Sequence, residues 1–162
     1  MLKSIQGNFD HPEVNELLEK HFIELRAASP VGSAHVLDIP GLKIPSIKFW
    51  SLWEGEKLMG CGALKFLDKE HGEFKSIRVH DNFRKKGNGI KVINHLIDEA
   101  RRLNIKRISI ETGAGSFFEP ARKLFDQCDF KPCEPFAHYK VDVNSIYLTK
   151  FIDTNLNKKS II

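Results

Sequence analysis

Apolar side chains recur every three or four residues in three segments of the chain, which predicts three amphipathic helices. The first segment covers residues 12–28, and Asp10 is a candidate cap for its N-terminus. The second covers residues 88–103, with Ile90, Ile93, Ile97 and Ala100 on its predicted buried face. The third covers residues 118–128.

Shorter runs rich in β-branched and aromatic residues predict strands between and around these helices. The runs are residues 2–9, 46–53, 57–66, 73–79, 106–111, 134–141 and 145–151. Residues 31–45 fit neither pattern, so we expect a functional loop or a short helix there. Trp50 and Trp53 are three apart in one strand and should face opposite sides of the sheet, one in the core and the other lining a pocket.

The order of these elements predicts an α/β (α+β) fold. A helix joins strands 73–79 and 106–111, so these two should run parallel, while the other strands pair mostly antiparallel. The sheet should carry helices on both faces. Residues 1–152 are expected to form a single domain, with residues 153–162 as a loose tail.

Composition restricts the function classes only modestly. A chain of 162 residues with a net charge of +4 is large enough for one core and not basic enough to indicate a nucleic-acid binder. The three cysteines, Cys61, Cys128 and Cys133, form no disulfide pattern and no metal-binding spacing. No leader or membrane-length apolar run is visible, so the sequence predicts a cytoplasmic protein without a metal.

The most informative segment is Arg84-Lys85-Lys86-Gly87-Asn88-Gly89. It lies between a predicted strand and a predicted helix, where the free N–H groups and the dipole of the helix attract anions. Glycines let a phosphate approach the main chain, and three cations precede them. The segment therefore predicts a pyrophosphate site. It has the spacing of neither the NTPase loop nor the dinucleotide fingerprint.

The segment matches R-x-x-G-x-G, the acyl-CoA loop of the GNAT acetyltransferases. Residues 118–130 resemble the second motif of that family, N-x-x-A-x-x-L-Y-x-x-x-G-F, in spacing and apolar positions. Together the motifs make the chain similar to GNAT enzymes over roughly residues 9–150, and most similar to a bacterial branch of N-acetyltransferases. The resemblance implies a GNAT fold, with a splayed parallel strand pair at the acyl-CoA site, and acetyl-CoA as the acyl donor.

The resemblance also implies which residues hold the donor. They are Ile77, Arg78, Val79, Arg84, Lys85, Lys86, Gly87, Asn88, Gly89, Ile90 and Phe118. The first three would act through backbone N–H groups that stabilise the oxyanion. Asn88 is also a candidate helix cap.

Three positions depart from the family pattern. Phe118 stands where Asn commonly holds the pantetheine arm, a role for which main-chain contacts or another side chain, such as Ser116, are the candidates. Phe125 stands where Tyr commonly protonates the leaving thiolate, although a thiol of pKa about 8.5 leaves readily without an acid. Asp129 replaces the glycine that ends the helix in a left-handed conformation, which Asp tolerates.

The candidates for the general base are Glu111, Glu73 and His80, in that order. Each also has a structural interpretation: a strand-end partner for Glu111, a surface hairpin residue for Glu73 and a turn residue for His80. His35 on the irregular loop is a further candidate. His138 and Tyr139 lie where the family builds its acceptor pocket, or else they pack in the core.

The sequence leaves three functions open. The first is an N-acetyltransferase that acts on a primary amine of a small molecule or peptide by direct attack in a ternary complex. The second is a non-catalytic acyl-CoA-binding module. A nucleic-acid-binding domain, using basic clusters at residues 84–86, 101–102 and 106–107, is the least supported because no reading motif is present. We expect no nucleic-acid or membrane partner, and a homodimer is possible.

Overall fold

The computed structural model describes residues 1–153 and contains one seven-stranded sheet in the order β1-β2-β3-β4-β5-β7-β6. The strands are β1 (Leu2–Gln6), β2 (Ile47–Glu54), β3 (Lys57–Phe66), β4 (His71–Val79), β5 (Arg107–Gly113), β6 (Lys131–Pro132) and β7 (Ser145–Phe151). All neighbours pair antiparallel except β4 and β5, which are parallel. The expected mixed sheet with its central parallel pair is confirmed.

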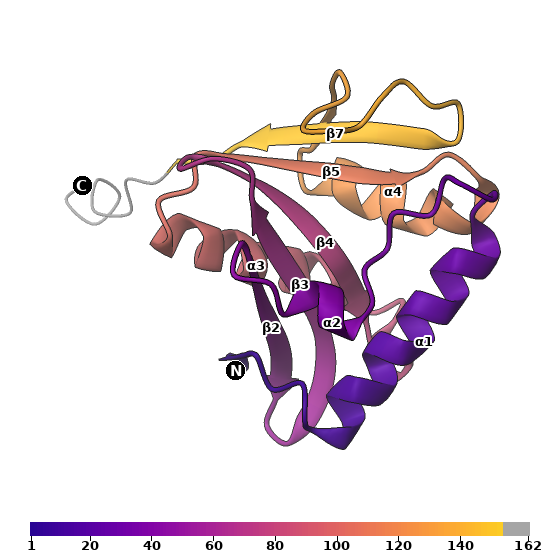
Figure 1. The fold of residues 1–162 in the computed structure, drawn as a ribbon. Coiled ribbons are helices and arrows are strands. Elements are labelled where there is room, and N and C mark those ends of the chain that lie inside the picture. The colour runs from indigo at the N-terminus through magenta and orange to yellow at the C-terminus, as the bar shows by residue number, and fades with distance from the viewer. Residues whose placement is uncertain (154–162) are drawn as a thin grey trace.

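Helices cover both faces of the sheet (Figure 1). They are α1 (Pro12–Ala28), α2 (Ile39–Leu42), α3 (Asn88–Arg102) and α4 (Glu119–Gln127), with 3-10 turns η1 (Asp81–Phe83) and η2 (Ser116–Phe118). The loop expected at residues 31–45 contains the short α2. The predicted cap of α1 is wrong by one residue, because His11 and not Asp10 accepts the Glu13 N–H.

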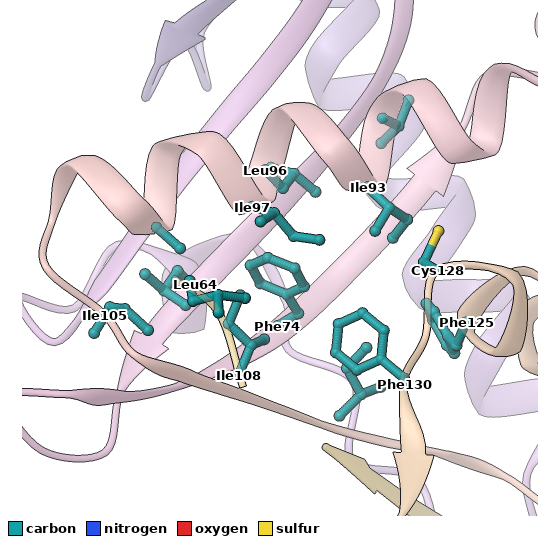
Figure 2. Close-up of a cluster of buried hydrophobic side chains, with 14 of the residues drawn as sticks. Leu64, Phe74, Ile93, Leu96, Ile97, Ile105, Ile108, Phe125, Cys128 and Phe130 are labelled. Carbon is teal, nitrogen blue, oxygen red and sulfur yellow. The ribbon is translucent and has the colours of Figure 1, made fainter. Parts of the chain in front are cut away.

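Two hydrophobic clusters, one on each face, hold the layers together. On the α3–α4 face, residues from both sides of the parallel pair pack together, as Figure 2 shows for Leu64, Phe74, Ile97, Ile108 and Phe130. On the other face the hydrophobic contacts of α1 and α2 are with β2 and β3. The end of β4 reaches α1 through the ion pair of Arg78 with Glu24, while Tyr139 from a loop covers Glu73 and Lys75.

Trp50 and Trp53 do face opposite sides of the sheet, one in each cluster. Both are buried in core, so the expectation that one would line a pocket is wrong.

The predicted strand at residues 134–141 does not form. The structure has only the two-residue β6 before this stretch, and Tyr139 N–H donates to the Phe136 carbonyl in a turn. Pro135 withholds an N–H donor, and Ala137 has a φ of 53°, which breaks extended backbone. The proposed tail falls almost entirely on residues 154–162, outside the described residues.

Candidate active site

The parallel pair separates soon after it begins. Only three residue pairs join β4 to β5, and the last is Glu73 with Ser109. Beyond it a bulge opposite Gly62 puts Ser76 at a φ of 54°. A cavity of about 530 Å³ lies between the diverging strands, bounded by α1, α4 and the loop before α3. The expected splay and bulge are thus present at the predicted position.

The bulge determines which side chains of β4 face which side of the sheet. Phe74, Ile77 and Val79 pack with the α3–α4 cluster. Lys75 and Arg78 take the opposite face, where Arg78 forms an ion pair with Glu24 of α1. The cavity borders side chains of both faces, so it connects them through the gap in the sheet.

The basic loop closes one end of the cavity. Arg84, Lys85, Gly87, Gly89 and Ile90 line it. Gly87 is the N-cap of α3 with a φ of 76°, and Lys85 also lies in the left-handed region at 64°. These conformations turn the chain so that the first N–H groups of α3 point out of the helix toward this end.

Lys86 and Asn88 lie in the same loop but do not line the cavity. Asn88 is buried, and its side-chain amide donates to the Phe83 carbonyl, so it ties α3 to η1 and does not cap the helix.

Gly89 has a packing role in addition to the predicted one, and Ile90 differs from what the sequence indicated. A Cβ at position 89 would lie 2.9–3.0 Å from the two δ-carbons of Leu124, so Gly89 allows α3 and α4 to pack closely. Ile90 was predicted on the buried face of the helix. It is 37% exposed and faces the cavity, because the buried stripe of α3 runs through Val92, Ile93, Leu96, Ile97 and Ala100.

Aromatic side chains from η2 and α4 form one wall of the cavity. Phe118 and Phe125 both line the cavity, and Phe125 also packs on Phe130. Phe118 covers Gly113 at the end of β5. Arg122 Nη1 donates to the carbonyls of Gly113 and Gly115, at 2.7 and 2.8 Å, and fixes the connection between β5 and α4. Ser116, the suggested substitute for Asn, is exposed and does not line the cavity.

Two carboxylates lie at the opposite end. Glu111 on β5 lines the cavity and accepts a hydrogen bond of 2.7 Å from Ser145 Oγ. Burial, opposed in part by the Ser145 hydrogen bond, raises the pKa of Glu111 above its usual value. Glu73 on β4 is 2% exposed and does not line the cavity. Its Oε2 accepts from the Tyr139 hydroxyl at 2.6 Å and from Lys75 Nζ at 3.3 Å.

The loops of residues 29–37 and 133–144 lie together over this end. Ser33 Oγ donates to Asp142 at 3.0 Å, and the rings of His35 and Tyr139 meet edge to face at 5.1 Å. His35 lines the cavity, whereas His138 is exposed. Burial and the neighbouring Glu73 raise the pKa of Tyr139, so this hydroxyl stays a hydrogen-bond donor at neutral pH.

His80 lies apart from the two carboxylates. It follows β4, caps η1 through Nδ1, which accepts the Asn82 N–H, and does not line the cavity. Of the three candidate bases, Glu111 is the one that borders the cavity.

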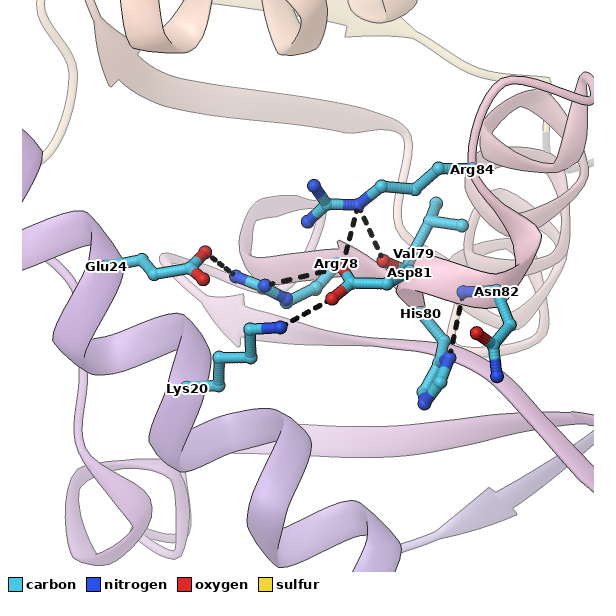
Figure 3. A network of polar contacts seen from close by, with 8 residues as sticks. All are labelled: Lys20, Glu24, Arg78, Val79, His80, Asp81, Asn82 and Arg84. Carbon is cyan, nitrogen blue, oxygen red and sulfur yellow. Dashed lines mark hydrogen bonds and ion pairs between the residues drawn. The ribbon is translucent and has the colours of Figure 1, made fainter.

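A charged network, which sequence reasoning missed, links α1 to the end of β4 (Figure 3). Glu24 Oε2 lies 2.8 Å from Arg78 Nη1, and Asp81 Oδ1 lies 3.8 Å from Arg78 Nη2 and 3.3 Å from Arg84 Nε. Lys20 pairs with the other oxygen of Asp81. His21, buried beside this network, lines the cavity, and burial followed by the Arg78 charge lowers its pKa to about 4. No local pattern could have identified this network, because its members come from segments more than 50 residues apart.

The thiols are not activated. Burial raises the pKa of Cys61 to about 12 and raises those of Cys128 and Cys133 as well. Within residues 1–153 no three His, Cys, Asp or Glu side chains are grouped to hold a metal ion. In the same part of the chain no helix is long and apolar enough to cross a membrane.

Fold and site together define the class. The site has a splayed parallel pair with a β4 bulge, a basic glycine loop at the N-terminus of a helix and a half-buried carboxylate across the gap. These features suit an acyl-CoA-dependent transferase. The model of the acetyltransferase (GNAT) family matches residues 12–130, and the chain belongs to this family. It is thus an N-acetyltransferase by family, as its sequence predicted.

Proteins of similar sequence carry N-acetyltransferase names, and a protein of similar structure is a GNAT family acetyltransferase. An uncharacterized N-acetyltransferase from Bacillus subtilis (strain 168), YsnE, is 46% identical over 138 residues, which cover 85% of this chain and 91% of that protein. An uncharacterized N-acetyltransferase from Escherichia coli (strain K12), YedL, is 40% identical over 139 residues, 86% of this chain and 87% of that protein. The crystal structure of a GNAT family acetyltransferase from Elizabethkingia anophelis with acetyl-CoA bound has a TM-score of 0.65 at 18% identity, covering 93% of this chain and 98% of that one.

Proposed function

We propose that the protein transfers the acetyl group of acetyl-CoA to a primary amine of a small molecule or peptide. The observation that carries this proposal is the continuity of one cavity from the N-terminus of α3, through the gap between β4 and β5, to the carboxylate of Glu111. A long thioester fits such a passage, with its phosphates on the basic loop and its acyl group at the splay. The amine enters from the face covered by the loop of residues 29–37.

The basic loop is the proposed donor phosphate site. Arg84, Lys85 and the N–H groups that follow Gly87 supply positive charge and hydrogen-bond donors to the pyrophosphate. Lys86 contributes charge from outside the cavity, and Asn88 acts through the backbone it holds in place.

The oxyanion would form beside the bulge of β4. Beyond Glu73, β4 has no hydrogen-bonded pairs with β5, which leaves main-chain groups of Ile77, Arg78 and Val79 near the cavity. Such a backbone donor typically contributes about 2.7–4 kcal/mol to the stabilisation of a tetrahedral intermediate.

Glu111 is the proposed general base. It borders the cavity, and its raised pKa brings it toward that of a protein base working near neutral pH. Glu73 accepts hydrogen bonds from Tyr139 and Lys75 through Oε2 and does not line the cavity, so we assign it to positioning the Lys75 ammonium and the Tyr139 ring. The assignment of His80 as the general base stays a prediction, and no observation favours it over Glu111.

The chemistry proceeds by direct attack of the amine nitrogen on the thioester carbon. The N–C bond forms as Glu111 accepts the amine proton, and the C–S bond breaks as the tetrahedral intermediate collapses. The coenzyme A thiolate leaves without a protein acid, since Phe125 offers no proton. A ping-pong route is disfavoured because the three thiols have raised pKa values.

Two variants of one residue test the donor site. Position 87 has no atom within 4 Å of an added Cβ, whereas a side chain at position 89 would displace Leu124. Gly87→Asp places a carboxylate at the phosphate site, and Gly87→Asn has the same shape without the charge. In calorimetric titrations with acetyl-CoA we expect Gly87→Asn to retain most of the affinity and Gly87→Asp to lose it at least tenfold. Equal affinities in the two variants would place the phosphates elsewhere.

The alternative function is an acyl-CoA-binding module without catalysis, and Phe118 and Phe125 are the features that favour it. Release of the coenzyme A thiol in a single turnover with any amine separates the two. An active enzyme releases about one thiol per bound acetyl-CoA, and a binding module releases none above the rate of spontaneous hydrolysis.

The cytoplasmic location and the homodimer expected from the sequence stay predictions.

A further inference from the structure

The α1 side of the cavity carries an arginine that leaves part of its hydrogen-bonding capacity unused. Arg78 is 5% exposed and borders the cavity, and its Nε and Nη2 atoms are buried without a hydrogen-bond partner. Only Nη1 is engaged closely, by Glu24 at 2.8 Å, while Asp81 lies 3.8 Å from Nη2. A buried donor without a partner destabilises the fold, and more so when it is charged, so such an arrangement needs an explanation.

The two unpaired nitrogens have a geometric property in common. Nε–H and Nη2–H point in the same direction along one side of the guanidinium, and this pair is the fork that binds a carboxylate or a phosphate through two parallel hydrogen bonds. Glu24 occupies the end of the guanidinium and leaves that side free of hydrogen bonds. The ion pair therefore holds the arginine in place without using its fork.

The surroundings also favour an anion. Lys20, Arg78 and Arg84 face the two carboxylates of Glu24 and Asp81, which gives an excess of one positive charge in the network of Figure 3. His21, 6% exposed and lining the cavity, adds an uncharged imidazole that can donate or accept one hydrogen bond.

Asp81 links Arg78 to Arg84 of the basic loop, but the two arginines serve different faces of the sheet in this proposal. The side chain of Arg78 lies on the α1 face of the sheet, where the amine would enter, while Val79 and Ile77 beside it pack toward α3. Arg78 lies five residues beyond Glu73, the last β4 residue that pairs with β5, and Glu111 lies two residues beyond Ser109, the partner of Glu73. The difference of three residues corresponds to about 10 Å of regular strand, before the bulge, the divergence of the strands and the reach of the side chains are taken into account.

We propose that Arg78, supported by His21, is a subsite for an anionic group, a carboxylate or phosphate, carried by the amine acceptor. This inference rests on the proposed acetyl transfer, and it narrows the acceptor to small molecules in which a primary amine and an anion are joined by a short chain. Arg78 would determine specificity, and Glu111 would still remove the proton.

Matched acceptors test the subsite. The pairs are β-alanine and β-alaninamide, 4-aminobutyrate and 4-aminobutyramide, and O-phosphoethanolamine and ethanolamine, with release of the coenzyme A thiol as the readout. The wild type should prefer the anionic member of at least one pair by tenfold or more in kcat/KM. A preference in the carboxylate pairs or in the phosphate pair also identifies which anion the acceptor carries.

Two variants separate binding of the ligand from a structural role. Arg78→Lys keeps the charge and an ion pair with Glu24 but loses the fork, so the preference should fall to threefold or less. Glu24→Gln removes the ion pair and keeps the fork, so the preference should persist. If Glu24→Gln abolishes the preference as completely as Arg78→Lys does, Arg78 acts through the position of α1 and the proposal is wrong.

Binding measurements distinguish failure of this inference from failure of the proposed function. Calorimetry of acetyl-CoA tests the donor site, and N-acetyl-β-alanine against N-acetyl-β-alaninamide, titrated into the CoA-bound protein, tests the subsite without turnover. Tighter binding of the carboxylate, lost in Arg78→Lys, supports the subsite. Equal binding of the two ligands contradicts it, as does a tenfold loss of acetyl-CoA affinity in Arg78→Lys, which would assign the fork to the donor.

Discussion

At the scale of single residues, two glutamates on adjacent parallel strands have different surroundings. The carboxylate of Glu73 accepts hydrogen bonds from a phenol and an ammonium, and it is sealed from the cavity. Glu111 has one hydroxyl donor and borders the cavity. Chemically identical side chains thus receive a structural and a reactive environment from their neighbours.

Glu111→Gln is expected to lower kcat about 10²–10⁴-fold, the usual contribution of a general base, with acetyl-CoA affinity unchanged. Glu73→Gln is the matched control and should lower the melting temperature while reducing kcat less than tenfold, because it leaves the Lys75 charge without its partner. Steady-state kinetics and thermal melts of both variants provide the check. A larger loss of kcat in Glu73→Gln than in Glu111→Gln would identify Glu73 as the general base.

The activity should also depend on pH in a defined direction. Burial raises the pKa of Glu111, and only its ionised form accepts a proton. The rate should therefore rise as the pH increases through this raised pKa, above the usual range of a glutamate. A plot of kcat/KM against pH for the wild type should show this rise, and the residual activity of Glu111→Gln should lack it.

Asp129 is a residue whose backbone conformation the sequence predicted and the structure confirms, with a φ of 67° just after α4. Asp129→Gly removes the steric cost of the left-handed region and should stabilise the fold by up to ~1 kcal/mol, with activity unchanged. Asp129→Ala, which retains Cβ without the polar group, should destabilise it by a similar amount. Urea melts of the three proteins test the ranking.

At the scale of elements, the junction of α3 and α4 depends on the absence of a side chain at Gly89. A methyl group there would lie 2.9–3.0 Å from the δ-carbons of Leu124. Gly87, two residues earlier, has open space around it but a φ of 76°. The two glycines of the loop are therefore required for different physical reasons.

A double-mutant cycle separates these reasons. Gly89→Ala should be destabilising, and Leu124→Ala in the same chain should recover part of the loss, since it removes the clashing atoms. Gly87→Ala should cost about 1 kcal/mol through its left-handed backbone, and Leu124→Ala should not compensate for it. Equal coupling of Leu124 to both glycines in denaturant melts would contradict this assignment.

The elements also show what sequence patterns can and cannot predict. The sequence patterns located the three longer helices, and they located β2–β5 and β7, each of which contains a run of consecutive buried residues. The pattern at residues 134–141 was misleading, since Val141 is 85% exposed on loop backbone. The contact between Tyr139 and Glu73 spans 66 residues, and no local pattern specifies such a pairing.

At the scale of the whole molecule, the sheet consists of two parts joined by a narrow strip. Three parallel residue pairs and the α3–α4 hydrophobic cluster connect β1–β4 to β5–β7 (Figure 2). On the α1 side the connection is made by polar contacts, including those of Tyr139 with Lys75 and Glu73. A ligand lying between β4 and β5 would contact both parts at once.

Acetyl-CoA is therefore expected to stabilise both parts together. At 100 times its Kd, a ligand that binds only the folded state adds about 2.7 kcal/mol. Hydrogen exchange should slow at the amides of residues 77–79 and 110–113, and the unfolding transition should stay single. Protection confined to the loop of residues 84–89 would show that the ligand does not enter the gap between the strands.

The packing of Phe118 on Gly113 has a consequence for how this branch of the family varies. A Cβ at position 113 would lie 2.1–2.3 Å from the Phe118 ring, so the two positions are not independent. During evolution, a residue larger than glycine at position 113 should be accepted only after the aromatic ring at position 118 has been lost. An aromatic ring at position 118 should likewise be accepted only where position 113 is glycine. Across homologous genes, positions 113 and 118 should therefore change as a pair. Chains with Asn at position 118 should not require glycine at position 113.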